Sequence, residues 1–164
     1  MNPALRPPQP LTAVHIVDDF SCGEPVLDDW IKHRALLNQE NGASRTFVVA
    51  DPDGRVLGYY ALAAGAASHQ AAPGYIRRNM PDPIPVLVLG RLAVDRRVQG
   101  TKLGAALLQD AIKRAAAVAQ NAGVRALLVH ALNERARQFY AHYGFRPSPM
   151  NPRTLMLRLE IAPV

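Results

Sequence analysis

The spacing of apolar side chains predicts helices at three places along the chain. In residues 25–39 (PVLDDWIKHRALLNQ) apolar positions recur every three or four residues, the period of one helix face, and Gly42 follows as a stop. Residues 103–119 repeat this pattern, with Gly123 placed to end the helix. A third helix is expected over residues 133–143, opened by an asparagine cap and closed by a glycine.

Other segments carry the patterns of strands. Residues 45–50 (RTFVVA) and 55–62 (RVLGYYAL) flank the turn-forming sequence DPDG and predict a hairpin. Residues 86–94 (VLVLGRLAV) form a nearly continuous apolar run, which is typical of a central strand. A strand is expected at residues 125–132, and the alternation over residues 154–161 predicts a half-buried final strand.

The order of these elements predicts the fold class. Between the hairpin and the central strand, residues 63–85 are rich in Ala, Gly and Pro and indicate a long connection with one short helical piece. We find no internal repeat and no separable linker. We therefore expect an α/β protein with a mixed sheet, forming a single domain over residues 1–164 with a flexible N-terminus at residues 1–12.

Composition narrows the protein classes. The chain has 164 residues, 49% of them hydrophobic and 20% charged, which suits one globular domain and excludes a disordered chain. No run approaches the roughly 18 apolar residues of a membrane span, and the first ten residues lack the apolar core of a signal peptide. The lone Cys22 cannot form an internal disulfide. A cytoplasmic protein without a membrane partner is expected.

The chain is strongly basic. Its formal net charge is +6 and its pI is about 10.0, and all but three of its 19 basic residues are arginines. Arginine is well suited to phosphate, so polyanions are plausible partners. A genome rich in G and C would produce the same arginine bias, and the composition leaves both explanations open.

The turn between the central strand and the following helix has the chemistry of an anion site. A helix that starts directly after a strand points several unpaired N–H groups at one spot. Gly100 and Gly104 allow close approach, and Arg96, Arg97 and Lys102 add positive charge. A diphosphate is the obvious ligand, although the sequence contains neither GxxxxGK[ST] nor GxGxxG. The alternative is an ordinary connection with solvated basic side chains.

This turn resembles a motif of the GNAT family of N-acetyltransferases, with the signature Q/R-x-x-G-x-G/A. The signature falls on QGTKLG, so Lys102 stands where the family has its first glycine. The later segment VHALNERARQFYAHYGF resembles a second family motif. The resemblance implies a mixed, mostly antiparallel sheet with splayed central strands flanked by helices, and acetyl-coenzyme A between those strands. It implies these cofactor-binding residues: Leu92, Ala93, Val94, Arg97, Val98, Gln99, Gly100, Lys102, Leu103, Gly104, Ala105 and Asn133.

A narrower resemblance comes from three longer segments. LDDWIKHRALLNQENGASRTFVV, RRNMPDPIPVLVLGRLAVD and the second motif are together similar to the acetyltransferase toxins of bacterial toxin–antitoxin modules. This resemblance implies transfer of acetyl from acetyl-coenzyme A to the α-amino group of aminoacyl-tRNA, which blocks translation. It also implies a homodimer and a small ribbon-helix-helix antitoxin, with DNA bound only through the antitoxin complex.

The residues for acetyl transfer can be sought individually. By resemblance Tyr140 is the acid that protonates the coenzyme A sulfur, whereas without it a helix tyrosine is ordinary packing, as we expect for Tyr143. Backbone N–H groups near Ala93 and Val94 can stabilise the oxyanion. We find no general base. An α-amine, with a pKa of about 8, depends less on a general base than a lysine amine, whose pKa is about 10.4.

Two further site expectations concern nucleic acid and metal. Basic residues outside the turn are candidates for tRNA contact, although each alone suits a solvated surface. They are Lys32, Arg34, Arg45, Arg77, Arg78 and Arg91. The five histidines show no metal-ligand spacing, so we expect no metal site.

Two alternative functions stay open. One is an acetyltransferase acting on a small amine or a protein N-terminus. The other is a non-catalytic module that binds nucleic acid or a protein partner, in which the turn with Lys102 no longer holds the cofactor.

Overall fold

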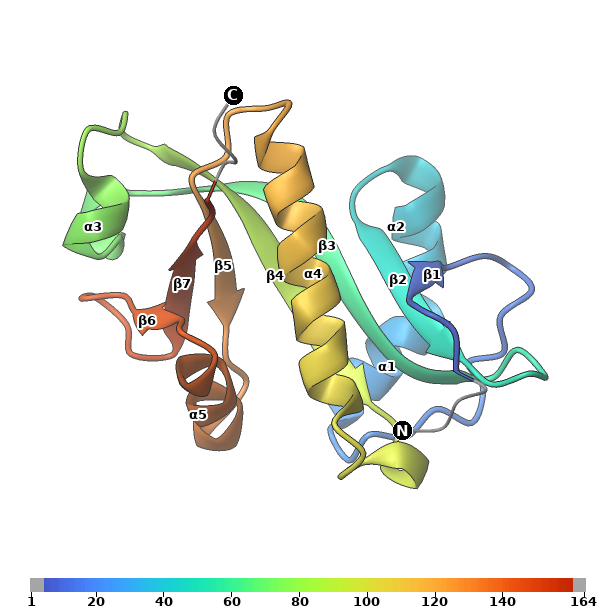
Figure 1. Ribbon diagram of the computed structural model, residues 1–164. Coiled ribbons are helices and arrows are strands. Elements are labelled where there is room, and N and C mark those ends of the chain that lie inside the picture. The colour runs from blue at the N-terminus through green and yellow to red at the C-terminus, as the bar shows by residue number, and fades with distance from the viewer. Residues whose placement is uncertain (1–4, 161–164) are drawn as a thin grey trace. The chain divides into compact units, whose positions relative to one another are not determined.

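The computed structural model describes residues 5–160. Seven strands are hydrogen-bonded in the order β1-β2-β3-β4-β5-β7-β6 (Figure 1). The pairing of β4 with β5 is parallel, whereas β1–β2, β2–β3, β5–β7 and β6–β7 are antiparallel. The expected mixed, mostly antiparallel sheet is confirmed. No helix in residues 5–160 has the length and apolar character that a membrane crossing requires.

The helices and strands divide between two compact units. Unit 1 comprises residues 5–63 and 90–111, and unit 2 comprises residues 64–89 and 112–160, so β3, β4 and α4 contribute to both. The elements are β1 Gln9–Pro10, α1 Pro25–His33, α2 Ala35–Asn41, β2 Arg45–Ala50, β3 Val56–Ala67, η1 His69–Ala71, α3 Gly74–Arg77, β4 Ile84–Val94, η2 Arg96–Val98, α4 Leu103–Ala119, β5 Ala126–His130, α5 Glu134–His142, β6 Arg146–Pro147 and β7 Thr154–Arg158.

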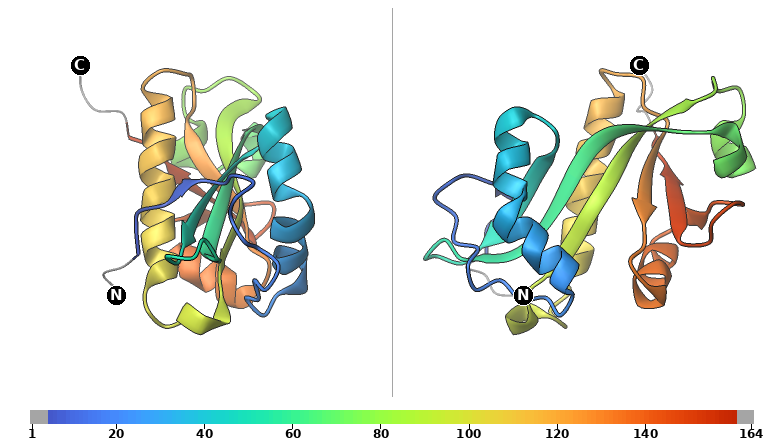
Figure 2. Two further views of the ribbon diagram at one scale, coloured as in Figure 1. Left: turned by 90° about the vertical axis from the view of Figure 1, so that its right-hand side faces the viewer. Right: turned by 180° about the vertical axis from the view of Figure 1, so that it is seen from behind.

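Unit 1 is built on the predicted hairpin of β2 and β3. Successive residues of β3 point to opposite faces, so Tyr59 packs with Trp30 of α1 while Gly58 faces Leu103 and Leu107 of α4. A Cβ at position 58 would lie 2.9 Å from Leu107 Cδ1, so any other residue there would require Leu107 to move. Figure 2 (left view) shows α1 and α2 on one side of the hairpin and the first turns of α4 on the other.

Unit 2 has its core around β5 and β7. Ile76 of α3 is fully buried with Ile84, Val86 and Met156 in one apolar cluster. Each such side chain contributes about 1.5–3 kcal/mol on burial. Because α3 covers Met156, β7 is buried on both faces at its start, and the expectation of a half-buried strand was wrong there.

The helix expected over residues 25–39 is interrupted. Arg34 leaves helical geometry at φ −127°, which separates α1 from α2. No glycine or proline marks this position. The interruption accompanies burial of Ile31 and Ala35, one on each side of it, in the same cluster, so it follows from tertiary packing. The predicted stop is confirmed, because Gly42 adopts φ +81° at the end of α2.

The two ends of the chain lie partly outside the described residues. The flexible segment expected over residues 1–12 lies partly outside the described residues, and within residues 5–12 the strand β1 pairs with β2 while Leu11 is buried. The final strand ends at Arg158 in the structure, and the last residue expected in it, Ile161, lies outside the described residues.

Candidate active site

The turn between β4 and α4 uses backbone conformations that glycine favours. Gly100 has φ +82° and Lys102 has φ +68°, and α4 begins at the next residue, Leu103. Lys102 therefore occupies the left-handed region that its place in the signature demands. The first N–H groups of a helix have no partner inside it, so the start of this 17-residue helix has the donors that an anion site requires.

Side chains of the turn hold it from within. The Gln99 amide donates from Nε2 to the main-chain oxygens of Cys22 at 2.8 Å and Val94 at 2.9 Å. Thr101 Oγ1 donates to Val98 O at 2.6 Å. Gln99 is expected among the cofactor-binding residues. Its side chain is hydrogen-bonded within the protein, so its backbone is the part that can contact a ligand.

A buried carboxylate fixes the residues before the turn. Asp95 is only 1% exposed and accepts hydrogen bonds from the backbone N–H groups of Ser21 and Arg97. Arg97 also donates from Nε at 2.8 Å and from Nη2 at 3.0 Å. Burial alone would raise the pKa of Asp95, but these hydrogen bonds outweigh it and hold the pKa below its usual value.

The same contacts occupy Arg97. Its guanidinium is engaged by Asp95 and lies 3.4 Å from Asp19, and the hydrogen bonds that it donates to Asp95 raise its pKa. The sequence places Arg97 among the cofactor-binding residues, whereas in the structure its side chain faces two carboxylates. Its charge is therefore largely matched inside unit 1.

The central strand runs beyond its parallel partner. Pairing of β4 with β5 spans Val86–Leu89 and Ala126–Val129, and β4 continues to Val94. In this continuation Ala93 is buried in the unit 1 core, and Leu92 and Val94 are half-buried. The extension supplies the strand backbone that the expectation for these three residues requires.

Tyr140 lies on α5 in unit 2 and is 6% exposed. Its ring packs against Phe139 and Phe145, with centroids 5.3 and 5.5 Å away. Burial raises the pKa of its hydroxyl far above the usual value, so it retains its proton at physiological pH. The described residues provide no hydrogen-bond partner for this hydroxyl. It is therefore a proton donor whose proton is not engaged within residues 5–160.

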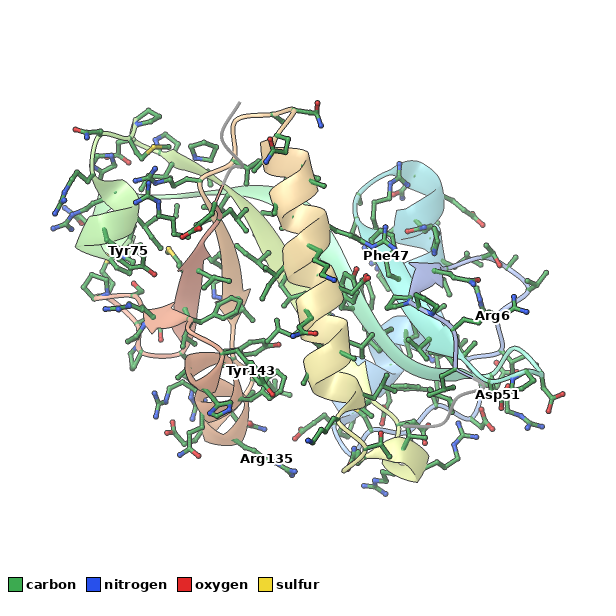
Figure 3. All side chains as sticks on the ribbon, viewed as in Figure 1. Arg6, Phe47, Asp51, Tyr75, Arg135 and Tyr143 are labelled. Carbon is green, nitrogen blue, oxygen red and sulfur yellow. The ribbon has the colours of Figure 1, made fainter. Side chains whose placement is uncertain are left out.

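Two neighbours of Tyr140 have different roles. The predicted cap is confirmed, because Asn133 Oδ1 accepts from Ala136 N at 2.9 Å and starts α5. Tyr143, labelled in Figure 3, is 39% exposed and packs edge-on against Phe139 and His142. Gly144 follows at φ +94° and ends the helix as predicted.

The expected cofactor-binding residues and the expected acid, Tyr140, divide between the two units. Unit 1 holds the turn, its flanks and the end of β4, and unit 2 holds the N-cap of α5 and Tyr140 on that helix. The first group is Leu92, Ala93, Val94, Arg97, Val98, Gln99, Gly100, Lys102, Leu103, Gly104 and Ala105, and the second is Asn133 and Tyr140.

The basic residues expected to contact tRNA divide between the two units. Lys32, Arg34, Arg45 and Arg91 belong to unit 1, whereas Arg77 and Arg78 belong to unit 2. The Arg91 guanidinium stacks over the Trp30 ring, 5.1 Å from its centroid, and Arg45 donates to Gln39 O at 2.7 Å. The other four have charged groups that form no ion pair within residues 5–160.

Sequence reasoning missed one residue of this site and found no metal pattern. This residue is Asp95, to which the structure gives the N-cap of η2 and the Arg97 contact. The local signal for this cap is an aspartate that directly follows a strand and whose carboxylate can accept a hydrogen bond from the backbone N–H two residues later.

Within residues 5–160, no group of three or more His, Cys, Asp or Glu is placed to hold a metal ion.

The chain is similar in sequence to known acetyltransferases. Residues 43–147 match the family model of the acetyltransferase (GNAT) domain. The chain is similar to the tRNA-acetylating toxin of Mycobacterium tuberculosis (strain ATCC 25618 / H37Rv), with 52% identity over 155 residues, covering 94% of this chain and 93% of that protein.

Similar solved structures include three assemblies of AtaT. AtaT complexed with acetyl-methionyl-tRNAfMet has a TM-score of 0.87 and 31% identity, covering 94% of both chains. A tyrosine-to-phenylalanine mutant of the AtaT toxin, bound to the C-terminus of the antitoxin AtaR and acetyl-CoA, has a TM-score of 0.82 and 30% identity, covering 94% of this chain and 93% of that one. The AtaT–AtaR complex bound to DNA has a TM-score of 0.75 and 30% identity, covering 92% and 93%.

Proposed function

The chain belongs to the GNAT family of acetyltransferases, and we propose that it is the toxin of a toxin–antitoxin module. It transfers the acetyl group of acetyl-coenzyme A to the α-amino group of aminoacyl-tRNA and so blocks translation. The observation that carries this proposal is the 52% identity, over 94% of this chain, to a tRNA-acetylating toxin.

The turn of unit 1 is the proposed pyrophosphate site. Backbone N–H groups at the start of α4 and the exposed Lys102 ammonium meet the negative charge of the cosubstrate. Hydrogen bonds of the Gln99 and Asp95 side chains to the backbone stabilise the conformation of the turn. The pantetheine arm lies along the backbone of residues 92–94, whose N–H groups stabilise the oxyanion of the tetrahedral intermediate.

Tyr140 is the proposed general acid. The substrate amine attacks the thioester carbonyl, the C–S bond breaks, and the leaving thiolate takes the proton of the Tyr140 hydroxyl. Burial keeps that hydroxyl protonated until the thiolate forms. The attacking amine releases its own surplus proton to solvent, and solvent reprotonates the tyrosine oxygen. A tyrosine-to-phenylalanine mutant of AtaT is among the forms of that toxin solved with antitoxin and acetyl-CoA.

The substrate amine explains why no base is required. An α-amino group has a pKa of about 8, so a substantial fraction is neutral at pH 7, whereas a lysine amine is almost entirely protonated. This difference favours an aminoacyl ester over a protein lysine. A small amine or a protein N-terminus shares the same chemistry and is the competing substrate class.

The proposal extends to partners. AtaT binds the antitoxin AtaR, and their complex binds DNA. For this chain we propose a small ribbon-helix-helix antitoxin as partner, DNA binding only through that complex, a homodimer and a cytoplasmic location. The net charge of +6 suits both an RNA substrate and an acidic antitoxin segment.

The test is transfer of labelled acetyl from acetyl-coenzyme A to total tRNA, charged and uncharged. Label on charged tRNA alone, released by base hydrolysis as N-acetylamino acid, supports the proposal and identifies the amino acid. Tyr140→Phe is expected to lose turnover and keep cofactor binding, and Tyr143→Phe, the exposed neighbour, is the matched control. Label on small amines or protein N-termini instead of tRNA would overturn the proposed substrate.

A further inference from the structure

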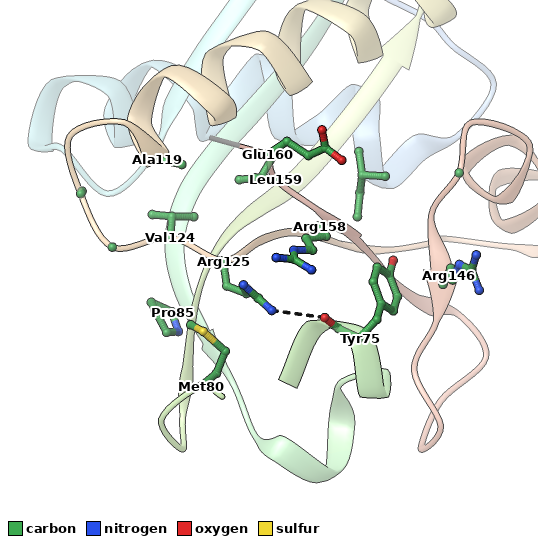
Figure 4. A pocket seen from close by; sticks show the side chains of 14 residues that line it. Tyr75, Met80, Pro85, Ala119, Val124, Arg125, Arg146, Arg158, Leu159 and Glu160 are labelled. Atoms are coloured by element: carbon green, nitrogen blue, oxygen red, sulfur yellow. Dashed lines mark hydrogen bonds between the residues drawn. The ribbon is translucent and has the colours of Figure 1, made fainter. Parts of the chain in front are cut away.

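Unit 2 contains an open hollow whose walls are rich in arginine. It has a volume of about 940 Å³ and lies between α3, the turn after α4 and the end of β7 (Figure 4). Arg125, Arg146 and Arg158 line it together with Tyr75, and Glu160 is the one carboxylate residue of the lining. Arg78 lines an adjoining hollow that also includes Tyr75, Arg125 and Arg158. Positive side chains from separate parts of the sequence therefore converge there.

Arg125 is held rigidly without a negative partner. Its Nε donates to Ile76 O at 2.9 Å, and its Nη2 lies 3.3 Å from Tyr75 O and 3.4 Å from Arg78 O, so it donates toward the end of α3. Main-chain oxygens fix the direction of a guanidinium but carry no net charge. Burial, with the Arg158 charge adding to it, lowers the pKa of Arg125, which agrees with a positive charge left without compensation.

The other arginines share this lack of an acidic partner. The Arg146 guanidinium lies over the Tyr75 ring, 5.3 Å from its centroid, and the Arg158 side chain points toward Arg125 in Figure 4. Neither these two nor Arg78 or Arg125 forms an ion pair in the described part of the chain. These arginines outnumber Glu160, the single carboxylate residue of the lining, and form no ion pair with it in the described part of the chain. They therefore repel one another, and an anion relieves that repulsion.

We propose that this hollow binds backbone phosphates of the tRNA substrate. The inference rests on the proposed function, in which the substrate is an RNA. Phosphate matches the planar fork of arginine, and two guanidinium groups beside an aromatic ring provide both charge and a surface for ribose or base. An acidic peptide has carboxylates but lacks the regular spacing of charge that a nucleic-acid backbone offers to several arginines at once.

The test uses the double variant Arg146→Gln/Arg158→Gln and uncharged tRNA as the binding probe. Arg125 is left intact, because it holds α3. Affinity is expected to fall on the order of tenfold or more at moderate salt, and the slope of log K against log salt is expected to decrease by up to about 2. The KM for charged tRNA should rise, while kcat at saturation and acetyl-coenzyme A affinity stay unchanged. Arg153→Gln, exposed in the same unit and outside the hollow, is the control.

Each outcome decides the inference. Unchanged tRNA affinity and salt slope in the double variant would overturn it. So would a loss confined to antitoxin binding, which would assign the hollow to an acidic peptide. If the wild-type protein acetylates no tRNA but binds it through Arg146 and Arg158, the hollow stands and the proposed function fails. Retained acetyl-coenzyme A binding shows that the variant is folded.

Discussion

The Gln99 side chain donates to the main-chain oxygen of Val94 at 2.9 Å, which ties the end of β4 to the turn before α4. The same amide donates to Cys22 O, so one side chain joins the strand, the turn and the segment before α1. The turn is therefore preorganised by its own sequence before any ligand binds.

Breaking this tie is expected to weaken cosubstrate binding. In Gln99→Ala, two main-chain oxygens lose their donor and the turn gains freedom that binding must then remove. We expect acetyl-coenzyme A to bind on the order of tenfold more weakly, because each such hydrogen bond contributes about 0.5–1.5 kcal/mol. Calorimetric titration measures the change. Gln109→Ala, exposed on α4, is the control, and equal affinities for the two variants would contradict the assignment.

The backbone of Lys102 predicts an unusual gain in stability. A non-glycine residue in the left-handed region costs about 1–2 kcal/mol, and a glycine there removes this cost. The glycine in turn loses about 0.5–1 kcal/mol of stability, because it gives up more conformational entropy on folding. With φ at +68°, Lys102→Gly should raise the free energy of unfolding by up to about 1 kcal/mol.

Thermal denaturation tests the Lys102 prediction. The melting temperature of Lys102→Gly should rise by about 2–4 °C per kcal/mol gained. Lys102→Ala removes the same ammonium but keeps the backbone strain, so it should show no gain. A melting temperature for Lys102→Gly at or below that of Lys102→Ala would show that the turn is not strained.

Local chemistry explains which features could be predicted from the sequence. The Asn133 cap, the Gly144 stop and the turn glycines depend on residues within a few positions of one another, and the structure has them where they were expected. The break at Arg34 has no local marker, because packing of Ile31 and Ala35 produces it.

Features assembled from distant segments could not be predicted. The hollow of unit 2 brings Tyr75, Arg125, Arg146 and Arg158 together from α3, the residue before β5, β6 and β7, and spacing in the sequence does not indicate this. In the same way, Arg97 is a plausible phosphate ligand as a sequence position, but the burial of Asp95 commits its side chain to a different contact.

Asp95 predicts a loss of stability in acid. Its pKa in the folded state lies below its ordinary value of 3.8, so its contribution is fully present above that value and is lost as the pH falls through the folded-state pKa. Asp95→Asn leaves Arg97 without its main partner and should cost about 1–3 kcal/mol at pH 7.

The pH dependence separates Asp95 from other carboxylates. Urea unfolding between pH 7 and pH 3 should show that the gap between wild type and Asp95→Asn narrows below about pH 4. Asp19→Asn removes only exposed contacts, at 3.4 Å to Arg97 and 3.8 Å to Arg55, and should cost at most about 1 kcal/mol. A gap for Asp95→Asn that stays constant down to pH 3 would show that lost packing, and not the charge, is responsible.

The pKa of Tyr140 predicts the shape of the pH–rate profile. Burial raises that pKa well above its usual value of about 10, so the acid form persists through the range in which the substrate amine loses its proton. The kcat/KM for acetyl transfer to aminoacyl-tRNA should therefore rise with pH up to the amine pKa, about 8, and stay level to about pH 9.5. Initial rates over seconds limit hydrolysis of the aminoacyl ester. A fall in rate between pH 8 and pH 9 would contradict Tyr140 as the acid, because a buried tyrosine does not ionise in that range. The control variant Tyr143→Phe should reproduce the wild-type profile.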